Sequence, residues 1–147
     1  MNAYTLLFPA NEKGYEQGLS YIDIIGARGL LFNEHDDCIS AESIKFLFRA
    51  LRSKHIDLND RYYAQTVVFV GKLSSKASPK LVRETMSKFQ ESIGDIPNWF
   101  ATVKNANTQI ELLIPTRDLN GKNLVLSEPD LHLLATFAKA VSAKEAK

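Results

Sequence analysis

A row of polar side chains on one predicted strand is the first feature of this sequence that could do chemistry. In the stretch NANTQIELLIP, Asn107, Gln109 and Glu111 occupy alternate positions, whereas Ile110 and Leu112 fall on the other alternation. Successive side chains of a strand point to opposite faces, so the three polar residues share one face. Amide and carboxylate oxygens suit Mg²⁺ or Mn²⁺. Three interpretations follow: a metal site, a nucleic-acid-binding face, or a strand face that contacts only water.

Tyr21 is the candidate nucleophile. It stands in the segment LSYIDIIG, shortly after an apolar run and a segment with two glycines. A tyrosine hydroxyl can attack a phosphodiester when a metal ion or nearby cations bind the non-bridging oxygens. The alternative interpretation is a core tyrosine whose hydroxyl reaches the surface.

Two groups of basic side chains could bind phosphate. The first comprises Arg49, Arg52, Lys54 and Arg61, and the second comprises Lys72, Lys76, Lys80, Arg83 and Lys88. Tyr62, Tyr63 and Phe69 lie between them in the sequence, and basic groups with aromatic neighbours suit phosphate contact combined with base stacking. The formal net charge is only +1, so such binding would depend on a local patch. The alternative is a set of solvated helix faces.

Several other classes of site receive no support. His35, His55 and His132 are far apart in the sequence, and the single cysteine, Cys38, excludes an internal disulfide and a cysteine-rich zinc site. The glycine-rich phosphate-binding motifs and the nucleophile-elbow motif are absent from the sequence. No apolar run approaches the roughly 18 residues of a membrane span, and the first residues do not resemble a signal peptide. We therefore expect a soluble, cytoplasmic protein without a membrane partner.

The elements that would position these residues alternate between strands and helices. Strands are expected at 4–9, 29–33, 64–73, 98–104, 108–115 and 123–127, and helices at 41–54, 79–93 and 128–141. Segment 10–18 is predicted as a loop or short helix, and 19–26 as a strand or a buried helical turn. Ser40 and Ser78 are predicted N-caps, Ser127 and Asp130 form a predicted capping box, and 142–147 is predicted to fray. The order predicts one α+β domain over 1–147, with an antiparallel or mixed sheet and about three helices packed on it.

Residues 4–26 and 60–126 resemble the N-terminal domain of plasmid mobilisation relaxases, which are tyrosine DNA-nicking enzymes. The segments that carry the resemblance are LLFPANEKGYEQGLSYIDIIG, YYAQTVVF, SPKLVRETMSKFQ, NWFATVK and QIELLIPTRDLNGKNL. The resemblance places Tyr21 at the nucleophile position and implies a relaxase-like fold. In the family a histidine-containing site holds the metal, but the equivalent positions here fall near Lys104, Asn105 or Asn107. Glu111 with Gln109 remain as the metal ligands that the resemblance implies.

Three functional hypotheses follow. The first is a relaxase-like protein of a mobile element that lacks the histidine metal site and acts by binding, either to DNA in single-stranded form or to a protein. The second is an active nicking enzyme in which Tyr21 attacks a DNA phosphate, assisted by Mg²⁺ or Mn²⁺ on Glu111 and Gln109. The third is an unrelated interaction module, such as an immunity or inhibitor protein, that makes contact through its acidic loop 34–42.

Overall fold

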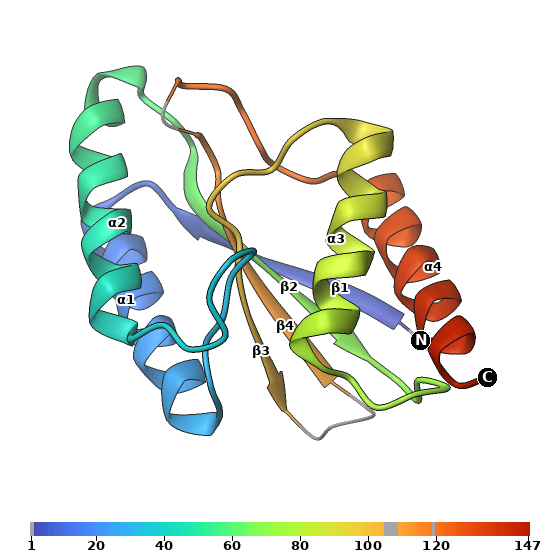
Figure 1. Ribbon diagram of the computed structural model, residues 1–147. Coiled ribbons are helices and arrows are strands. Elements are labelled where there is room, and N and C mark those ends of the chain that lie inside the picture. The colour runs from blue at the N-terminus through green and yellow to red at the C-terminus, as the bar shows by residue number, and fades with distance from the viewer. Residues whose placement is uncertain (1, 105–108, 119) are drawn as a thin grey trace.

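The computed structural model of the chain describes residues 2–104, 109–118 and 120–147 and has three layers (Figure 1). A four-stranded sheet forms the middle layer, helices α1 and α2 cover one face, and α3 and α4 cover the other. The elements in chain order are β1 (Asn2–Pro9), α1 (Glu12–Arg28), α2 (Ala41–His55), a short 3₁₀ helix (Ile56–Leu58), β2 (Tyr62–Val70), α3 (Pro79–Ile93), β3 (Phe100–Lys104), β4 (Gln109–Pro115) and α4 (Glu128–Glu145).

The sheet is antiparallel throughout, in the order β1-β2-β4-β3. The long strand β2 is internal, as its continuous apolar centre predicts. Strands β3 and β4 form the predicted hairpin, whose connecting residues 105–108 lie outside the described residues. The predicted α+β class and the helix-covered sheet are therefore confirmed, with four helices in place of about three.

The two faces of the sheet carry different kinds of core. Ile110, Leu112 and Ile114 face α3 and α4, where they join the larger apolar cluster around Phe89 and Trp99. The alternate positions of β4, which include Glu111, face α1 and α2. The predicted alternation is thus confirmed for the described residues of this strand, and it directs Gln109 and Glu111 towards the helix that carries the candidate nucleophile. Asn107, the third member of the predicted polar row, lies outside the described residues.

Helix α1 is the main difference from the prediction, because one continuous helix spans both 10–18, predicted as a loop or short helix, and 19–26, predicted as a strand or a buried helical turn. Asn11 caps it, since its side-chain oxygen accepts a hydrogen bond from the Gly14 backbone N–H at 2.8 Å. Glycine and β-branched residues have low helix propensity, which hid the helix from sequence reasoning. Gly14 and Gly18 are required by packing instead, because they lie against Pro9 and the Tyr63 hydroxyl. The other predicted caps, at Ser40, Ser78 and Ser127 with Asp130, are confirmed.

Three further predictions about elements need correction. Leu31 and Phe32 make isolated bridges and do not form a strand. Residues 123–127 do not form a strand either, since the buried amide of Gln65 binds both backbone groups of Leu126, at 2.8 and 3.1 Å. Helix α4 continues to Glu145 and buries Ser142, although the sequence predicted fraying from residue 142.

Among the described residues, no helix is both long enough and apolar enough to cross a membrane.

We expect Gly14→Ala to destabilise the protein by about 1–3 kcal/mol, the usual effect of overpacking a tight contact. A Cβ atom at residue 14 would overlap the Pro9 carbonyl oxygen, which belongs to the backbone and cannot rotate away. The matched control is Gly26→Ala in the same helix, where the nearest atom is Cδ1 of the Leu31 side chain at 3.1 Å. Alanine's higher helix propensity should leave that variant unchanged or more stable by up to about 1 kcal/mol. Urea unfolding followed by circular dichroism measures the free energy of unfolding of both variants. Equal values for Gly14→Ala and Gly26→Ala would contradict the packing role of Gly14.

Candidate functional site

Helix α1 brings Tyr21 to the polar row of β4. The Tyr21 hydroxyl donates a hydrogen bond to Oε2 of Glu111 at 3.4 Å, although the two residues are 90 positions apart in the sequence. Tyr21 is half-buried, and Phe8 packs beside it with ring centroids 5.7 Å apart. The fold thus brings Tyr21 into contact with the 109–111 strand.

Glu111 is a carboxylate in the interior, with 2% of its surface exposed. Buried charges need partners, and Glu111 has three. Arg28 donates from Nη1 to Oε1 at 3.2 Å, and Gln109 donates from Nε2 to the same oxygen at 2.9 Å, while Tyr21 contacts the other oxygen. The two predicted metal ligands thus contact each other, and the carboxylate is already surrounded by donors.

Sequence reasoning missed Arg28, although the spacing contained a signal. Tyr21 and Arg28 are seven residues apart, which is close to two turns of an α-helix, so both point towards the same side. That signal becomes readable only if the segment 12–28 is recognised as one helix. Arg28 also occupies the last turn of α1, where a cation is favoured by the helix dipole.

The surroundings of Tyr21 keep its hydroxyl protonated. Burial and then the negative charge of Glu111 raise the pKa of Tyr21 well above its ordinary value, and the charge of Arg28 offsets this only in part. A tyrosine must lose its proton to attack phosphorus, so this environment opposes nucleophilic attack. Glu111, as the hydrogen-bond acceptor, is the group to which that proton could move.

The neighbourhood of Glu111 holds one further polar group without a partner. Thr102 lies directly opposite Glu111 on β3, and its hydroxyl is fully buried with no hydrogen-bond partner among the described residues. Gly29, just after α1, approaches this hydroxyl so closely that a Cβ there would lie 3.0 Å from it. Within the described part of the chain, no group of three or more His, Cys, Asp or Glu residues has the arrangement of a metal site.

Beyond Tyr21, part of the same sheet face is open. Tyr4, Leu6 and Val70 are 50%, 53% and 41% exposed. Tyr4 pairs with Val68, and Val68 pairs with Glu111, so the exposed tyrosine and the buried carboxylate stand in one row across the sheet. Sequence reasoning missed Tyr4 because an unbroken apolar run does not reveal which of its residues stay uncovered.

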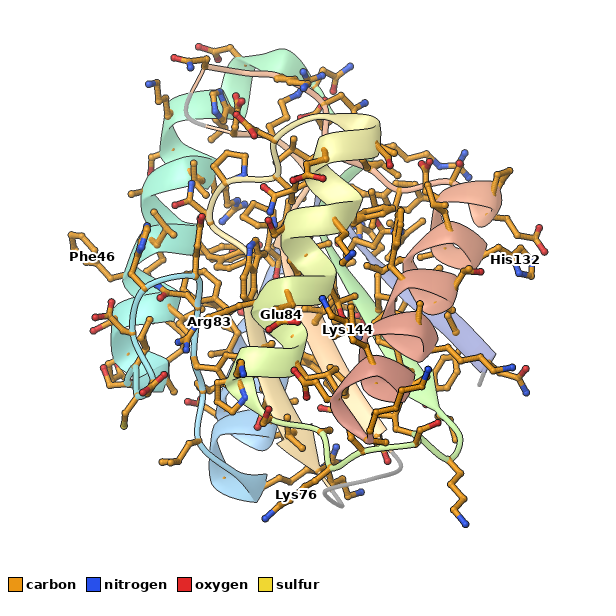
Figure 2. The ribbon with its side chains drawn as sticks, turned by 45° about the vertical axis from the view of Figure 1, so that its right-hand side comes forward. Phe46, Lys76, Arg83, Glu84, His132 and Lys144 are labelled. Atoms are coloured by element: carbon orange, nitrogen blue, oxygen red, sulfur yellow. The ribbon has the colours of Figure 1, made fainter. Side chains whose placement is uncertain are left out.

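The two predicted basic groups lie at opposite ends of the sheet. Arg61 precedes β2 and Lys72 follows it, and the nine residues of β2 separate the groups by roughly 30 Å at about 3.3 Å per residue. They therefore do not form one patch. The second group lies at the end where α1, β2 and β3 finish, and Lys76 marks that end in Figure 2. The second group is thus the one on the side of Glu111.

Not every basic residue in these groups faces solvent freely. Arg83 binds Asp37 at 2.7 Å and donates from Nε to the Asn33 carbonyl oxygen at 3.0 Å, so it fastens the 33–37 loop to α3. Its guanidinium also lies over the Phe32 ring. Arg83 therefore has a structural role, whereas Lys72, Lys76 and Lys80 are exposed. Of the three predicted stacking residues, Phe69 is buried, and Tyr62 and Tyr63 are half-buried.

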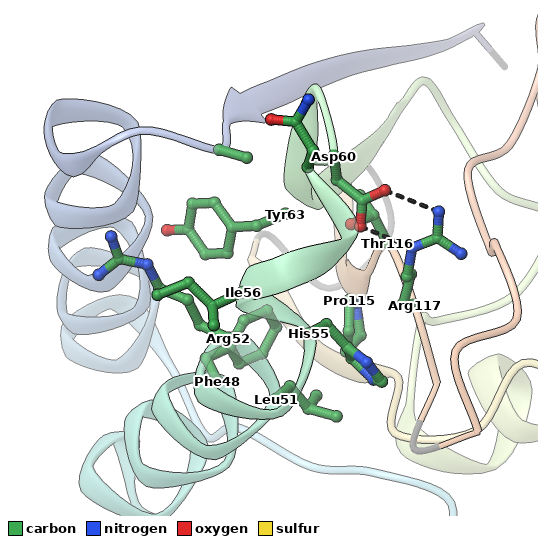
Figure 3. A pocket seen from close by; sticks show the side chains of 12 residues that line it. Phe48, Leu51, Arg52, His55, Ile56, Asp60, Tyr63, Pro115, Thr116 and Arg117 are labelled. Atoms are coloured by element: carbon green, nitrogen blue, oxygen red, sulfur yellow. Dashed lines mark hydrogen bonds and ion pairs between the residues drawn. The ribbon is translucent and has the colours of Figure 1, made fainter.

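Arg52 of the first basic group lines a pocket of about 130 Å³ between the end of α2 and strand β2 (Figure 3). Its polar side chains mostly bind one another. Asp60 accepts two hydrogen bonds from Arg117 at 2.6 and 2.7 Å, and Nε2 of His55 lies 2.7 Å from the Asp118 carbonyl oxygen. Arg52 stacks on the Tyr15 ring, 4.1 Å from its centroid. These contacts tie the 116–118 segment and α1 to α2, and Tyr21 does not line this pocket.

Comparison of the chain with family models, with curated proteins and with solved structures finds no match.

We expect the free energy of unfolding to fall as the pH rises above about 10, the ordinary pKa of tyrosine. The unfolded chain releases the Tyr21 proton near that pH, whereas the folded protein keeps it. Above this pH the folded state therefore binds more protons, so stability decreases with pH. Burial raises the pKa of Tyr63 as well, which gives an effect of the same sign.

Tyr21→Phe should make that fall shallower, and urea unfolding between about pH 8 and 12 measures the slope. Tyr63→Phe is the comparison variant. The Tyr63 hydroxyl donates a hydrogen bond to the Tyr15 carbonyl oxygen, so it shares no hydrogen-bond partner with the Tyr21 hydroxyl. Removing both hydroxyls should flatten the slope further. If the slope of unfolding free energy against pH were the same in Tyr21→Phe as in wild type, this would contradict the claim that folded Tyr21 keeps its proton.

Proposed function

We propose that the chain is a relaxase-like protein that binds single-stranded DNA on the α1 side of its sheet and acts by binding. The observation that carries this proposal is the row in which the half-exposed Tyr4 stands beside the Tyr21–Glu111–Arg28 cluster. An exposed aromatic ring next to fixed polar groups and cations is the combination that single strands need. We infer that the ligand is DNA from this combination of side chains and from the resemblance to relaxases.

The apolar part of this surface would hold bases. Tyr4 offers a ring for stacking, and Leu6 and Val70 extend the apolar surface on the same face. Stacking of a base on an aromatic side chain contributes about 1–3 kcal/mol and tolerates any base. Such a surface would favour unpaired strands, because the bases of a duplex are stacked on each other.

The cationic part would hold the phosphates. Lys104 pairs with Gln109 at the end of the β3–β4 ladder, and Arg28 keeps part of its side chain exposed while it binds Glu111. Lys72 and Lys76 follow β2 at the same end of the sheet. A net charge of +1 gives no general attraction, so these four cations would supply most of the electrostatic contribution.

The state of Tyr21 favours binding over cleavage. Its hydroxyl is donated to a carboxylate that two other side chains already contact, and its raised pKa keeps it neutral. The sequence also places no histidine where relaxases hold their metal. In this proposal Tyr21 and Glu111 hold α1 against the sheet and form one wall of the binding surface.

We expect wild-type protein to bind a labelled oligothymidine with an affinity that falls steeply as salt rises, because counterions are released from the phosphates. Tyr4→Ala should weaken binding about five-fold to 150-fold, the range that corresponds to loss of one stacked base. Lys104→Gln should reduce both affinity and salt dependence, whereas Lys54→Gln, on exposed α2 at the other end of β2, should change neither. Fluorescence anisotropy at several salt concentrations measures the affinity of wild type and of the three variants. Absence of binding at low salt, or equal losses in the two lysine variants, would refute the proposed surface.

A nicking enzyme is the second candidate, and the 3.4 Å contact between Tyr21 and Glu111 is the observation that favours it. In that reaction Glu111 accepts the phenol proton, and the Tyr21 oxygen attacks phosphorus. The bond between phosphorus and the 3′ oxygen breaks as the 5′-phosphotyrosine bond forms. The proton that Glu111 accepted passes to the leaving oxygen, which becomes a free 3′-hydroxyl.

The nicking reaction predicts a covalent protein–DNA adduct when the protein is incubated with origin-containing oligonucleotides and Mn²⁺. A denaturing gel reveals the adduct, which Tyr21→Phe should abolish. No adduct in wild type, or equal adduct in both proteins, rules this candidate out. The binding proposal predicts no adduct under the same conditions.

A further inference from the structure

The two edges of the sheet are protected to very different degrees. At the β3 edge, Phe32 exchanges two backbone hydrogen bonds with Ala101, each 2.9 Å long, so Phe32 covers the first part of that strand. Strand β3 also ends in Lys104, and a charged residue discourages pairing with another chain. At the other edge, β1 pairs with β2 alone, and no other described residue forms a bridge to it.

Strand β1 lacks the features that usually prevent an edge strand from pairing. It has eight residues, NAYTLLFP, and none of them is charged. Its proline, Pro9, comes last, and the register is regular from Asn2 to Phe8. A long, regular and uncharged edge presents a row of free backbone N–H and C=O groups that can pair with another strand.

We propose that a second copy of this chain pairs with β1 antiparallel to itself, so that two sheets join into one of eight strands. The two-fold axis lies midway between the Thr5 residues of the two copies, which therefore stand directly opposite each other. Tyr4 of each copy then lies opposite Leu6 of the other, and Ala3 lies opposite Leu7. The exposed Tyr4 and Leu6 thereby gain apolar neighbours on one face of the joined sheet, and the partly buried Ala3 and Leu7 gain them on the other.

The sequence of β1 makes a second copy a better partner than a strand of different composition. Tyr4 and Leu6 are the exposed pair on one face, and the axis brings them together as aromatic–aliphatic cross-strand pairs, which stabilise sheets. Like charges opposed across the axis would destabilise the pairing, and this strand has none. Every strand pair within the sheet is already antiparallel, so the symmetric pairing continues the existing arrangement.

The proposed assembly also stops at two copies. After β1 is paired, the outer strands of the joined sheet are the two copies of β3, each covered in its first part by Phe32. Closed two-fold pairing through one patch is the commonest way in which soluble proteins assemble. A single strand pair buries less than the roughly 1,200 Å² typical of stable complexes, so we expect a weak dimer that forms at micromolar or higher concentration.

The test is the molar mass in solution as a function of protein concentration, measured by sedimentation equilibrium. Wild type should rise from 16.5 kDa towards twice that value as concentration increases. Leu6→Lys should remain monomeric, because it places two like charges beside the pairing strands. The matched control is Phe46→Lys, which changes another exposed apolar residue, 71% exposed and pointing away from the body of the molecule on α2 (Figure 2).

The control should dimerise like wild type, and urea unfolding of both variants verifies that they are folded. A wild type that stays at 16.5 kDa throughout would overturn the proposal. Loss of the dimer in Phe46→Lys with retention in Leu6→Lys would place the interface on α2 and would overturn it equally.

Disulfide trapping tests the register. In a Cys38→Ser background, Thr5→Cys should form a crosslinked dimer, since directly opposed Cα atoms in antiparallel strands lie about 4.5–5.5 Å apart, within disulfide range. Ala3→Cys is the control, because the two copies of residue 3 would be four positions out of register, about 13 Å along the strands. Crosslinking of Ala3→Cys as fast as Thr5→Cys would exclude the axis at Thr5.

Discussion

The buried carboxylate of Glu111 constrains how one whole layer of the molecule packs. A charge in the middle of a sheet face is tolerated only when donors surround it, and β4 itself supplies just Gln109. The other two donors, Tyr21 and Arg28, come from α1 and are spaced two helical turns apart. Their contacts fix both the rotation of α1 about its axis and its position along the sheet. The second half of α1 is therefore held both by these polar contacts and by the apolar packing of Ile22 and Ile25.

The opposite end of α1 is held by close approach of its backbone and by the hydrogen bond from the Tyr63 hydroxyl to the Tyr15 carbonyl oxygen. Gly14 and Gly18 remove side chains where the helix meets Pro9 and Tyr63, so the backbone of α1 approaches closely. Lys45 connects α2 to α1, because its ammonium group lies 2.9 Å from the Asp23 carboxylate on α1. It also lies 2.6 Å from Glu42 on its own helix, and hydrogen bonds to Glu42 and Asp23 raise the pKa of Lys45. The two helices thus form one layer that follows the direction of α1 and leaves the start of β1 uncovered.

That uncovered region explains why the proposed binding surface and the proposed dimer edge are neighbours. The face of β1 offers Tyr4 and Leu6 to a ligand, while its edge offers backbone groups to another strand. Pairing of two copies would place two such faces side by side without covering them. The α3 and α4 side differs, because its strand residues belong to one continuous apolar core.

Periodicity and capping were enough to predict much of the fold. The alternation in β4 showed that Glu111 and Gln109 share a face opposite Ile110 and Leu112, and the serine caps located α2, α3 and α4. These signals could be read because each is contained within a single element, where local geometry decides which side chains lie together.

The candidate site was only partly accessible in this way. Tyr21 and Glu111 were both named as site residues, but the contact between them depends on how α1 lies across the sheet. Arg28 and the exposure of Tyr4 depend on the same packing, and so does the separation of the two basic groups by the length of β2. Local sequence determines which face a side chain occupies within its element. Only the packing of elements far apart in the chain decides whether that face is paired, covered or left open, because the partners that satisfy a charge or bury a ring come from other segments.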